Sequence, residues 1–260
     1  MDRVERDLLA DTLRKAMTST SGADLDAALV QIGWPELLAE YPDDAIGLVF
    51  GMLGETGSHA PLINDVVAVA AGRPVGGVLA LPYAGDRWVR WARDDTPSAA
   101  LDPAVPVHIV ATGEPVPLAA GRRALGWWLV GTGRAMLALA STHALDRTQF
   151  GRPIASFQAV RHRLAETLVA LEAAEATLAH ADDEFGALLA KAAAGRAALT
   201  AARHCQQVLG GIGFTAEHGL HRHVRHTLLL DGLLGSSREL TRAAGARVRA
   251  AGRAQRLASL

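Results

Sequence analysis

Apolar and polar positions follow the period of an α-helix over most of the chain. The first helix is predicted over residues 3–17, where the apolar side chains at helical spacing are those of Val4, Leu8, Leu9 and Leu13. A second helix is predicted to be capped by Asp24 and to end near Ile32, before Gly33. Shorter helices are predicted over residues 36–40, 45–57 and 61–71. Together these segments predict an N-terminal helical domain over residues 1–72.

Residues 73–118 carry a different pattern, in which short apolar runs are separated by prolines. The runs include VGGVLALPY, RWVRWA and VPVHIVA, and seven prolines lie in this segment. Runs of this length that are bounded by proline predict short antiparallel strands. A segment of about 45 residues is too small to fold without support from its neighbours.

Helical periodicity returns after residue 118. Four long helices are predicted, over residues 119–146, 157–181, 183–210 and 217–258. Long helices with short connections pack as an antiparallel bundle. The predicted fold is therefore mainly α, with an N-terminal helical domain (1–72), a reduced middle β segment (73–118) and a C-terminal four-helix bundle (119–260).

The composition is that of a protein with a substantial hydrophobic core. Half of the 260 residues are hydrophobic, a fifth are charged, and the formal net charge is -1. A charge near zero gives no argument for binding to nucleic acid or to an anionic membrane. Cys205 is the single cysteine, which excludes an internal disulfide, and charged residues follow Met1 where a signal peptide would be apolar. We therefore expect a cytoplasmic protein without a membrane span.

A polar and aromatic break interrupts the helical pattern in the stretch LDRTQFGRPIASFQAVRHRLAE, residues 145–166. Gly151 and Pro153 cannot continue a helix, and the residue before a proline favours extended backbone. The break brings several side chains that can bind a ligand to one end of the bundle: Arg147, Gln149, Arg152, Phe157 and Gln158.

Two stretches together resemble the signatures of the acyl-CoA dehydrogenase family. DRTQFGRPIASFQAVRHRLAE is similar to the family's R-x-Q-F-G-x-P-I-x-x-F-Q motif and the helix after it. QQVLGGIGFTAEHGLHRHVR, about fifty residues later, is similar to its Q-x-x-G-G-x-G-[FY]-x-x-E-x-x-L-x-R stretch. The resemblance covers most of residues 119–235, and IGWPELLAE is similar to the family's N-terminal L-G-x-x-x-L segment.

The resemblance implies a fold and a cofactor. Family members have an N-terminal helical domain, a middle β-domain and a C-terminal four-helix bundle, and they use FAD to dehydrogenate an acyl-CoA between Cα and Cβ. The two motifs reach across a dimer interface to the FAD of the adjacent subunit. By this resemblance, Arg147 would contact the FAD pyrophosphate. The other cofactor-binding residues would be Gln149, Phe150, Phe157 and Gln158 on the adenosine side, and Gln207, Gly210 and Gly211 through close backbone approach.

The chemistry of these residue types agrees with that implied role. A guanidinium presents a planar set of donors to phosphate oxygens. Glycines let backbone N–H groups come close to an extended cofactor beside a helix end, and phenylalanine offers an apolar wall to adenine. The competing interpretation is that the same residues only end helices and pack, as an isolated Gly-Gly-x-Gly usually does.

The family's catalytic base has no counterpart in the sequence. Active members carry a glutamate in a Y-E-G-T-like sequence after the bundle's final arginine, and Leu234 occupies that place here. Other members carry the base near the start of the first bundle helix, where this chain has Gly121, Arg122 and Arg123. Asp231 is a weak candidate for a displaced base, because on a helix it would lie on a face similar to that of Leu234. We assign no catalytic residue.

The middle segment also lacks the family's flavin cradle, which is rich in Thr, Ser, Trp and Gly. Trp88 and Trp91 are present in residues 73–118, but they can equally close the core. The absent base and the short segment point to one cause: the chain does not hold a flavin alone.

A subset of the family accounts for both departures. Actinobacterial acyl-CoA dehydrogenases for sterol side chains form α2β2 heterotetramers, with active sites between unlike subunits. This chain resembles the degenerate subunit, which keeps the cross-interface motifs. A larger acyl-CoA dehydrogenase-like subunit would supply the base, the isoalloxazine site and most contacts to the acyl-CoA substrate. FAD would be shared with that partner, the acyl group would be a steroid or similarly bulky, and an electron-transfer flavoprotein or similar acceptor would reoxidise the flavin.

Two other functions stay open at this point. The first is a non-catalytic pseudo-dehydrogenase that serves as a scaffold or dimerisation subunit. The second is a homomeric flavoenzyme with a moved base. A metal site is not expected in the histidine-rich segment that contains His218, His221, His223 and His226, because it lacks convergent carboxylates; we interpret these histidines as helix-surface or interface residues.

Overall fold

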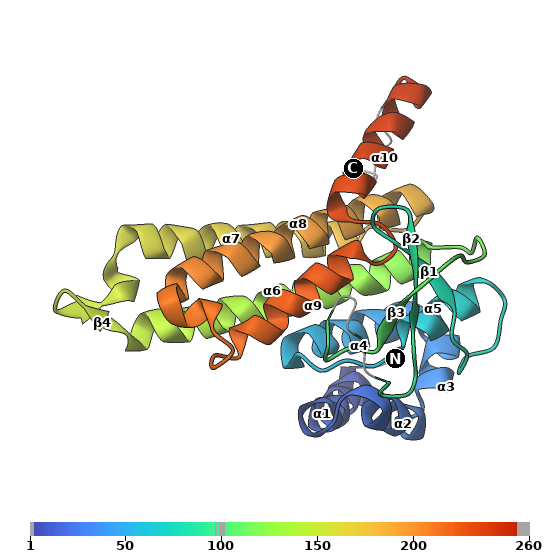
Figure 1. Cartoon of the computed structure of the whole chain (residues 1–260), viewed down its shortest axis with the longest axis horizontal. Helices are drawn as coiled ribbons and strands as arrows, with labels where there is room; N and C mark the ends of the chain where they lie inside the picture. The colour runs from blue at the N-terminus through green and yellow to red at the C-terminus, as the bar shows by residue number, and fades with distance from the viewer. Residues whose placement is uncertain (1–2, 97, 99–101, 254–260) are drawn as a thin grey trace.

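The computed structural model describes residues 3–96, 98 and 102–253. Its N-terminal third contains α1 (Arg3–Ser19), α2 (Gly22–Ile32), α3 (Trp34–Glu40), α4 (Pro42–Thr56) and α5 (Ile63–Ala70) (Figure 1). The helices predicted here are confirmed, with boundaries that shift by a few residues. The capping role of Asp24 is wrong, because α2 begins at Gly22 with Ser21 in the N-cap position. Gly33 ends α2 in the left-handed conformation, with φ 96°.

The middle segment forms a three-stranded antiparallel sheet. Its strands, in spatial order, are β1 (Ala80–Tyr83), β2 (Arg87–Trp91) and β3 (Val107–Val110). In the centre of the sheet, Val89 lies opposite Leu81 on one side and Ile109 on the other. The predicted short antiparallel strands are therefore confirmed.

The C-terminal half is built on three long helices, α6 (Ala119–Asp146), α7 (Gln158–Leu178) and α8 (Glu184–Leu209). The observed range of α6 is identical to the predicted one. Contacts between α6 and α8, and between α7 and α8, place α8 against both of its neighbours in the bundle. A mainly α fold with a helical bundle is confirmed.

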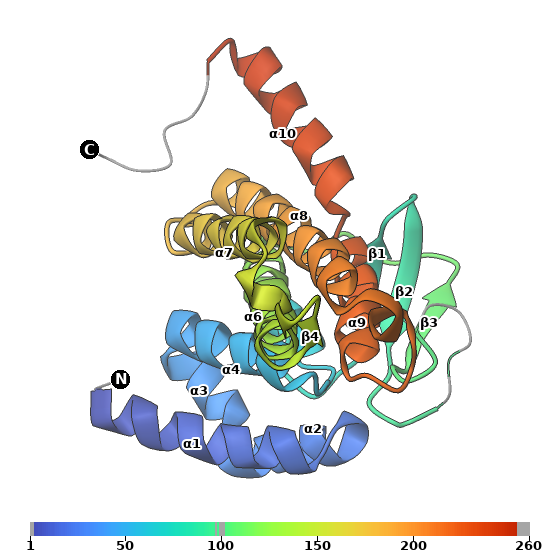
Figure 2. The ribbon, with the colours of Figure 1, turned by 90° about the vertical axis from the view of Figure 1, so that its left-hand side faces the viewer.

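The prediction of a single fourth helix is wrong. The predicted range contains two helices, α9 (Leu220–Gly232) and α10 (Ser237–Ala251), and its residues 254–258 lie outside the described residues. The chain turns because Leu234 and Gly235 both have positive φ, 57° and 99°. Ser236 then begins α10 through a capping box with Glu239. Figure 2 shows α10 directed away from the rest of the bundle.

The largest hydrophobic cluster draws residues from the N-terminal helices, the sheet and the bundle. Gly54 of α4 and Gly131 of α6 let the two helices approach closely: a Cβ on Gly131 would lie 2.0 Å from the carbonyl oxygen of Gly51, and a Cβ on Gly54 would lie 2.3 Å from that of Trp128. Trp128 of α6 stacks on Trp91 of β2, with ring centroids 5.4 Å apart. Trp91 therefore closes the core, and the small sheet is supported by the bundle. The division into domains at residues 72 and 118 stays a prediction.

No helix within residues 3–96 and 102–253 is both long enough and apolar enough to cross a membrane.

Candidate functional site

The break at residues 147–157 forms a small β-hairpin and a 3-10 turn. Strands β4 (Thr148–Gln149) and β5 (Arg152–Pro153) pair antiparallel, and η1 (Ile154–Ser156) leads into α7. The two residues of the loop, Phe150 and Gly151, both have positive φ, 53° and 76°. Two positive φ angles are the requirement of a two-residue type I′ turn, whose first position favours asparagine or glycine. Phenylalanine in that position is therefore strained.

The aromatic side chains of the hairpin contact one another in solvent. Phe150 is 91% exposed, and its ring lies edge-on to that of Phe157, with centroids 6.0 Å apart. The Arg152 guanidinium covers the same Phe157 ring at 4.3 Å from its centroid. A strained, exposed phenylalanine that is held in place by its neighbours is a feature typical of a contact surface rather than of a folding core.

The polar residues predicted at the hairpin are exposed and only lightly engaged. Arg147 ends α6, its backbone N–H donates to the carbonyl of His143, and its side chain makes no ion pair with another described residue. Gln149 donates to its neighbour's carbonyl, and Gln158 lies 3.4 Å from a ring nitrogen of His162. Their hydrogen-bonding groups are thus open to a ligand or a partner chain.

The second predicted motif follows α8. Gln207 is exposed in the last turn of α8, Gly210 ends the helix with φ 64°, and the 3-10 turn η2 (Gly210–Phe214) carries Gly211. Side chains added at Gly210 or Gly211 would meet nothing within 4 Å. The backbone of this turn is therefore open to close approach by another molecule. Phe214 at its end is 71% exposed.

A second hydrophobic cluster connects the elements that carry the two motifs. It contains Met136, Ala140 and Ala144 of α6 with Ala201, Ala202, Cys205, Val208 and Leu209 of α8, and Ile154 of η1 and Val160 of α7 pack against it. Burial raises the pKa of the Cys205 thiol to about 12, so this cysteine is an inert packing residue. The hairpin and η2 consequently lie at the same end of the bundle (Figure 1).

The structure brings Gln207 close to the start of α7. A recess of about 450 Å³ between α7 and α8 is lined by Ala159, Val160, Arg163, Arg203, His204, Gln207 and Val208. Of these lining residues, Gln207 is the one that is predicted from the sequence to belong to the cofactor site. Sequence reasoning missed Arg163, Arg203 and His204, although all three lie within five residues of a predicted site residue.

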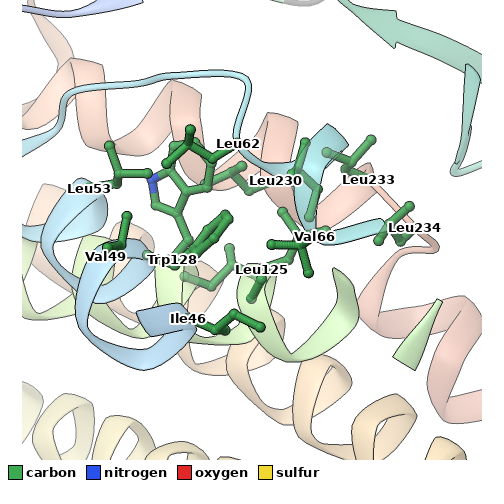
Figure 3. Packing of buried hydrophobic residues seen from close by; sticks show 14 of the residues in the cluster. Ile46, Val49, Leu53, Leu62, Val66, Leu125, Trp128, Leu230, Leu233 and Leu234 are labelled. Atoms are coloured by element: carbon green, nitrogen blue, oxygen red, sulfur yellow. The ribbon is translucent and has the colours of Figure 1, made fainter. Parts of the chain in front are cut away.

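The position predicted to correspond to the family's glutamate is closed. Leu234 is 0% exposed and belongs to the main core (Figure 3). Its N–H donates to the carbonyl of Pro82 at 2.8 Å, which ties the turn between α9 and α10 to β1. A Cβ on Gly121, at the other position predicted for a family base, would lie 2.7 Å from Cδ1 of Leu234. The two positions therefore face each other across an apolar contact.

The Asp231 carboxylate is used in a hydrogen bond that stabilises the fold. Its Oδ1 accepts the N–H of Ser237 at 3.1 Å, at the start of α10. The fully buried Lys191 donates from Nζ to the carbonyls of Asp231, at 2.7 Å, and Gly235. The prediction that Asp231 and Leu234 share a helix face is wrong, because α9 ends at Gly232.

The two arginines at the start of α6 also make structural contacts. Arg122 donates from Nε to the carbonyl of Leu234 at 3.2 Å, and Arg123 pairs with Asp43 at 2.7 Å. Burial lowers the pKa of Arg122 from its usual value.

The histidines of α9 lie partly inside the protein. His223 and His226 are predicted at the helix surface or at an interface, but in this chain they are 4% and 3% exposed. Burial lowers the pKa of His223 to about 4 and that of His226 to about 3, so both rings are neutral at pH 7. The described residues hold no group of three or more His, Cys, Asp and Glu side chains that could bind a metal.

Sequence comparison assigns the family. The family model of the acyl-CoA dehydrogenase C-terminal domain matches residues 116–249, just over half of the chain. Acyl-CoA dehydrogenase IpdE2 of Mycobacterium tuberculosis is 35% identical over 166 residues, which are 60% of this chain and 52% of that protein. Acyl-CoA dehydrogenase FadE34 of the same organism is 36% identical over 203 residues, or 67% of this chain and 28% of that protein. The matches thus span about half or less of these relatives.

Solved structures show the same fold. The Tcur3481–Tcur3483 steroid ACAD is similar with a TM-score of 0.70 and 20% identity, over 95% of this chain and 98% of that one. The ChsE4–ChsE5 complex from Mycobacterium tuberculosis is similar with a TM-score of 0.70 and 16% identity, over 96% of this chain and 98% of that one. The fold, both motifs and the family match agree, and the chain belongs to the acyl-CoA dehydrogenase family.

Proposed function

We propose that this chain is a subunit of a heteromeric acyl-CoA dehydrogenase and donates the pyrophosphate and adenosine clamp to an FAD that a partner subunit holds. The observation that carries the proposal is a contrast within the chain. The hairpin at Phe150 and the turn at Gly210 are exposed and open, whereas the place of the base is filled by buried Leu234. A chain with these properties is suited to complete a neighbour's site.

The residues present fit one part of FAD. Arg147, which makes no ion pair with another described residue, offers its guanidinium for the pyrophosphate, and Gly210 and Gly211 offer accessible backbone. Phe157, held under Arg152, offers an apolar surface beside Gln158 for adenosine. FAD, when bound, supplies the acceptor for the hydride that leaves the acyl Cβ.

The same structure does not fit the reactive end of the cofactor. A carboxylate would have to stand at Leu234 or Gly121, and both positions are packed against each other. Asp231 is engaged by the start of α10 and Arg122 by the carbonyl of Leu234. The base, the isoalloxazine site and the acyl-CoA contacts are therefore assigned to the partner, an acyl-CoA dehydrogenase-like chain in an α2β2 complex.

The names of similar proteins support the partner and the substrate class. The Tcur3481–Tcur3483 protein is described as a steroid ACAD, and ChsE4–ChsE5 as a complex. By analogy, the acyl group is that of a steroid side chain or a similarly bulky acid, and an electron-transfer flavoprotein or similar acceptor takes the electrons. The complex acts in the cytoplasm.

Co-expression with an acyl-CoA dehydrogenase-like chain from the same organism tests the proposal. The complex is expected to contain one FAD for every two chains, measured by flavin absorbance and light scattering, and the chain alone to contain none. Arg147→Ala is expected to lower FAD content at least tenfold while the complex still assembles. Arg196→Ala, which removes an exposed guanidinium from α8, serves as the matched control.

Three outcomes would contradict the proposal. If the chain alone binds FAD and oxidises an acyl-CoA, it is a homomeric enzyme with a moved base. If the complex forms without any dependence of FAD content on Arg147, the chain is a scaffold, an alternative with which the buried Leu234 is also consistent. If the chain forms no complex with any acyl-CoA dehydrogenase-like chain of the organism, the assigned partner is wrong.

A further inference from the structure

The recess between α7 and α8 has a cationic wall that the family motifs do not account for. Arg163 comes from α7, and Arg203 from α8. Neither guanidinium makes an ion pair with any described residue, and no carboxylate lines the recess. Two unneutralised guanidiniums at one cavity of about 450 Å³ attract an anion.

A ring of hydrogen bonds between Arg163, Thr167 and His204 holds Arg163 in place. The Thr167 hydroxyl donates to the carbonyl of Arg163 at 2.8 Å, so its oxygen is left to accept. Nδ1 of His204 lies 2.9 Å from that oxygen and therefore carries the proton. Nε2 of His204 then accepts from Nη1 of Arg163 at 3.3 Å.

The histidine is suited to this role because it stays neutral. His204 is 5% exposed, and burial, followed by the charges of Arg163 and Arg203, lowers its pKa from the usual value. A neutral imidazole keeps the free lone pair that orients the Arg163 guanidinium. An arginine that is held in one orientation loses less rotamer entropy when it binds an anion.

The start of α7 adds to the positive potential. Phe157 in the N-cap position makes no side-chain hydrogen bond to the first turn, and Ala159 and Val160 of that turn line the recess. The uncapped N-terminus of a long helix favours negative charge. Val208 and Val160 give the recess an apolar floor beside the charges, against which a planar ring can pack.

We propose that the α7–α8 recess binds a phosphate group of a nucleotide-type ligand, with Arg163 and Arg203 as the anion ligands and His204 as a positioning residue. Phosphate binding by the chain itself is independent of the proposed function. The identity of the molecule that carries the phosphate rests on that function: either the dinucleotide held by a partner subunit or the nucleotide end of an acyl-CoA.

Calorimetric titration of the purified full chain with pyrophosphate, ADP and adenosine tests the site. Pyrophosphate and ADP are expected to bind, ADP more tightly because of the apolar floor, and adenosine is expected to bind at least tenfold more weakly than ADP. Arg163→Gln and Arg203→Gln are each expected to weaken ADP binding at least tenfold. Arg161→Gln is the matched control, because Arg161 is exposed on α7 and does not line the recess.

The role of His204 is tested by two substitutions. His204→Gln keeps an acceptor for Arg163 and is expected to retain ADP affinity within about threefold, whereas His204→Leu is expected to lose most of it. Equal loss in both variants would show that His204 only packs. If wild-type chain binds neither pyrophosphate nor ADP, or binds them equally well after both arginine substitutions, the site does not exist.

The source of the phosphate is distinguished in the complex with the partner subunit. If Arg163→Gln and Arg203→Gln lower FAD content, the phosphate belongs to the dinucleotide. If FAD is retained while ADP binding is lost, a second ligand such as an acyl-CoA uses the recess, and competition by coenzyme A confirms it. Failure of the Arg147 experiment leaves the titration of the isolated chain unaffected, so the two proposals fail separately.

Discussion

Leu234 and Gly121 are packed so closely that a Cβ on Gly121 would lie 2.7 Å from Cδ1 of Leu234 and 2.8 Å from Cγ2 of Val67. The two positions that the resemblance predicts for the family's base thus share one apolar contact. This contact explains why neither position can hold an acid without repacking of the core.

Gly121→Ala is expected to destabilise the chain by about 1–3 kcal/mol, because the added methyl group overpacks the contact with Leu234. The measurement is urea unfolding followed by circular dichroism. Gly219→Ala is the control: a Cβ there meets nothing within 4 Å, and its φ of -56° suits alanine. Equal stability of the two variants would mean that the core opens easily at Leu234.

Leu234→Glu is expected to destabilise the chain by about 3–5 kcal/mol at pH 8 rather than to create an active enzyme, because the carboxylate would be buried without a partner. Burial raises the pKa of such a glutamate, so its destabilisation should shrink as the pH is lowered to 5. Leu234→Met serves as the uncharged control. A well-folded Leu234→Glu chain that dehydrogenates an acyl-CoA would contradict the closed-site interpretation.

Local sequence patterns were sufficient for α6 and for the break that follows it. The range 119–146 could be predicted because helical periodicity stops at Asp146 and Gly151-Arg152-Pro153 excludes a helix. The turn at Leu234 was harder, since apolar residues on both sides continue the periodicity. The capping box of Ser236 and Glu239 is the signal in the sequence that marks it.

The recess between α7 and α8 could not be predicted from sequence alone. Arg163 and His204 are 41 residues apart, and their contact depends on the register of two packed helices. The orientation of His204 further depends on the Thr167 hydroxyl, which is determined by the backbone of α7. Motif residues such as Gln207 could be predicted from the resemblance to the family and stay predictions, whereas residues specific to this chain needed coordinates.

Phe150→Asn is expected to stabilise the chain by about 1 kcal/mol, because asparagine tolerates the left-handed φ of 53° that strains phenylalanine. The same change should lower FAD content of the complex, since the aromatic wall is lost. Thermal unfolding and flavin absorbance measure the two effects. Phe214→Asn, also at an exposed phenylalanine but without positive φ, should give no gain in stability.

A gain in stability together with a loss of FAD would indicate that the strain at Phe150 serves binding rather than folding. If Phe150→Asn left FAD content unchanged, the exposed ring would have no role in the cofactor site. If it also left stability unchanged, the turn would not be strained.

Lys191 should make the stability of the chain depend on pH. Burial lowers its pKa from 10.5 to about 7 in the folded state, although the nearby Asp231 carboxylate opposes the shift. Between pH 7 and 10.5 the unfolded chain therefore binds more protons at this site than the folded chain. Above the pKa that Lys191 has in the unfolded chain, this group costs the folded chain no stability. As the pH falls from there towards the pKa of Lys191 in the folded chain, the free energy of unfolding decreases.

Between pH 7.5 and 9, the free energy of unfolding of the wild type should rise by about 1.4 kcal/mol per pH unit relative to that of Lys191→Met, which cannot titrate. Lys191→Met should be less stable than the wild type at pH 9, because the carbonyls of Asp231 and Gly235 lose their donor. The only other lysine, Lys15, is exposed on α1, and Lys15→Met should follow the wild type at both pH values. Parallel behaviour of wild type and Lys191→Met would show that the buried ammonium is fully compensated by its surroundings.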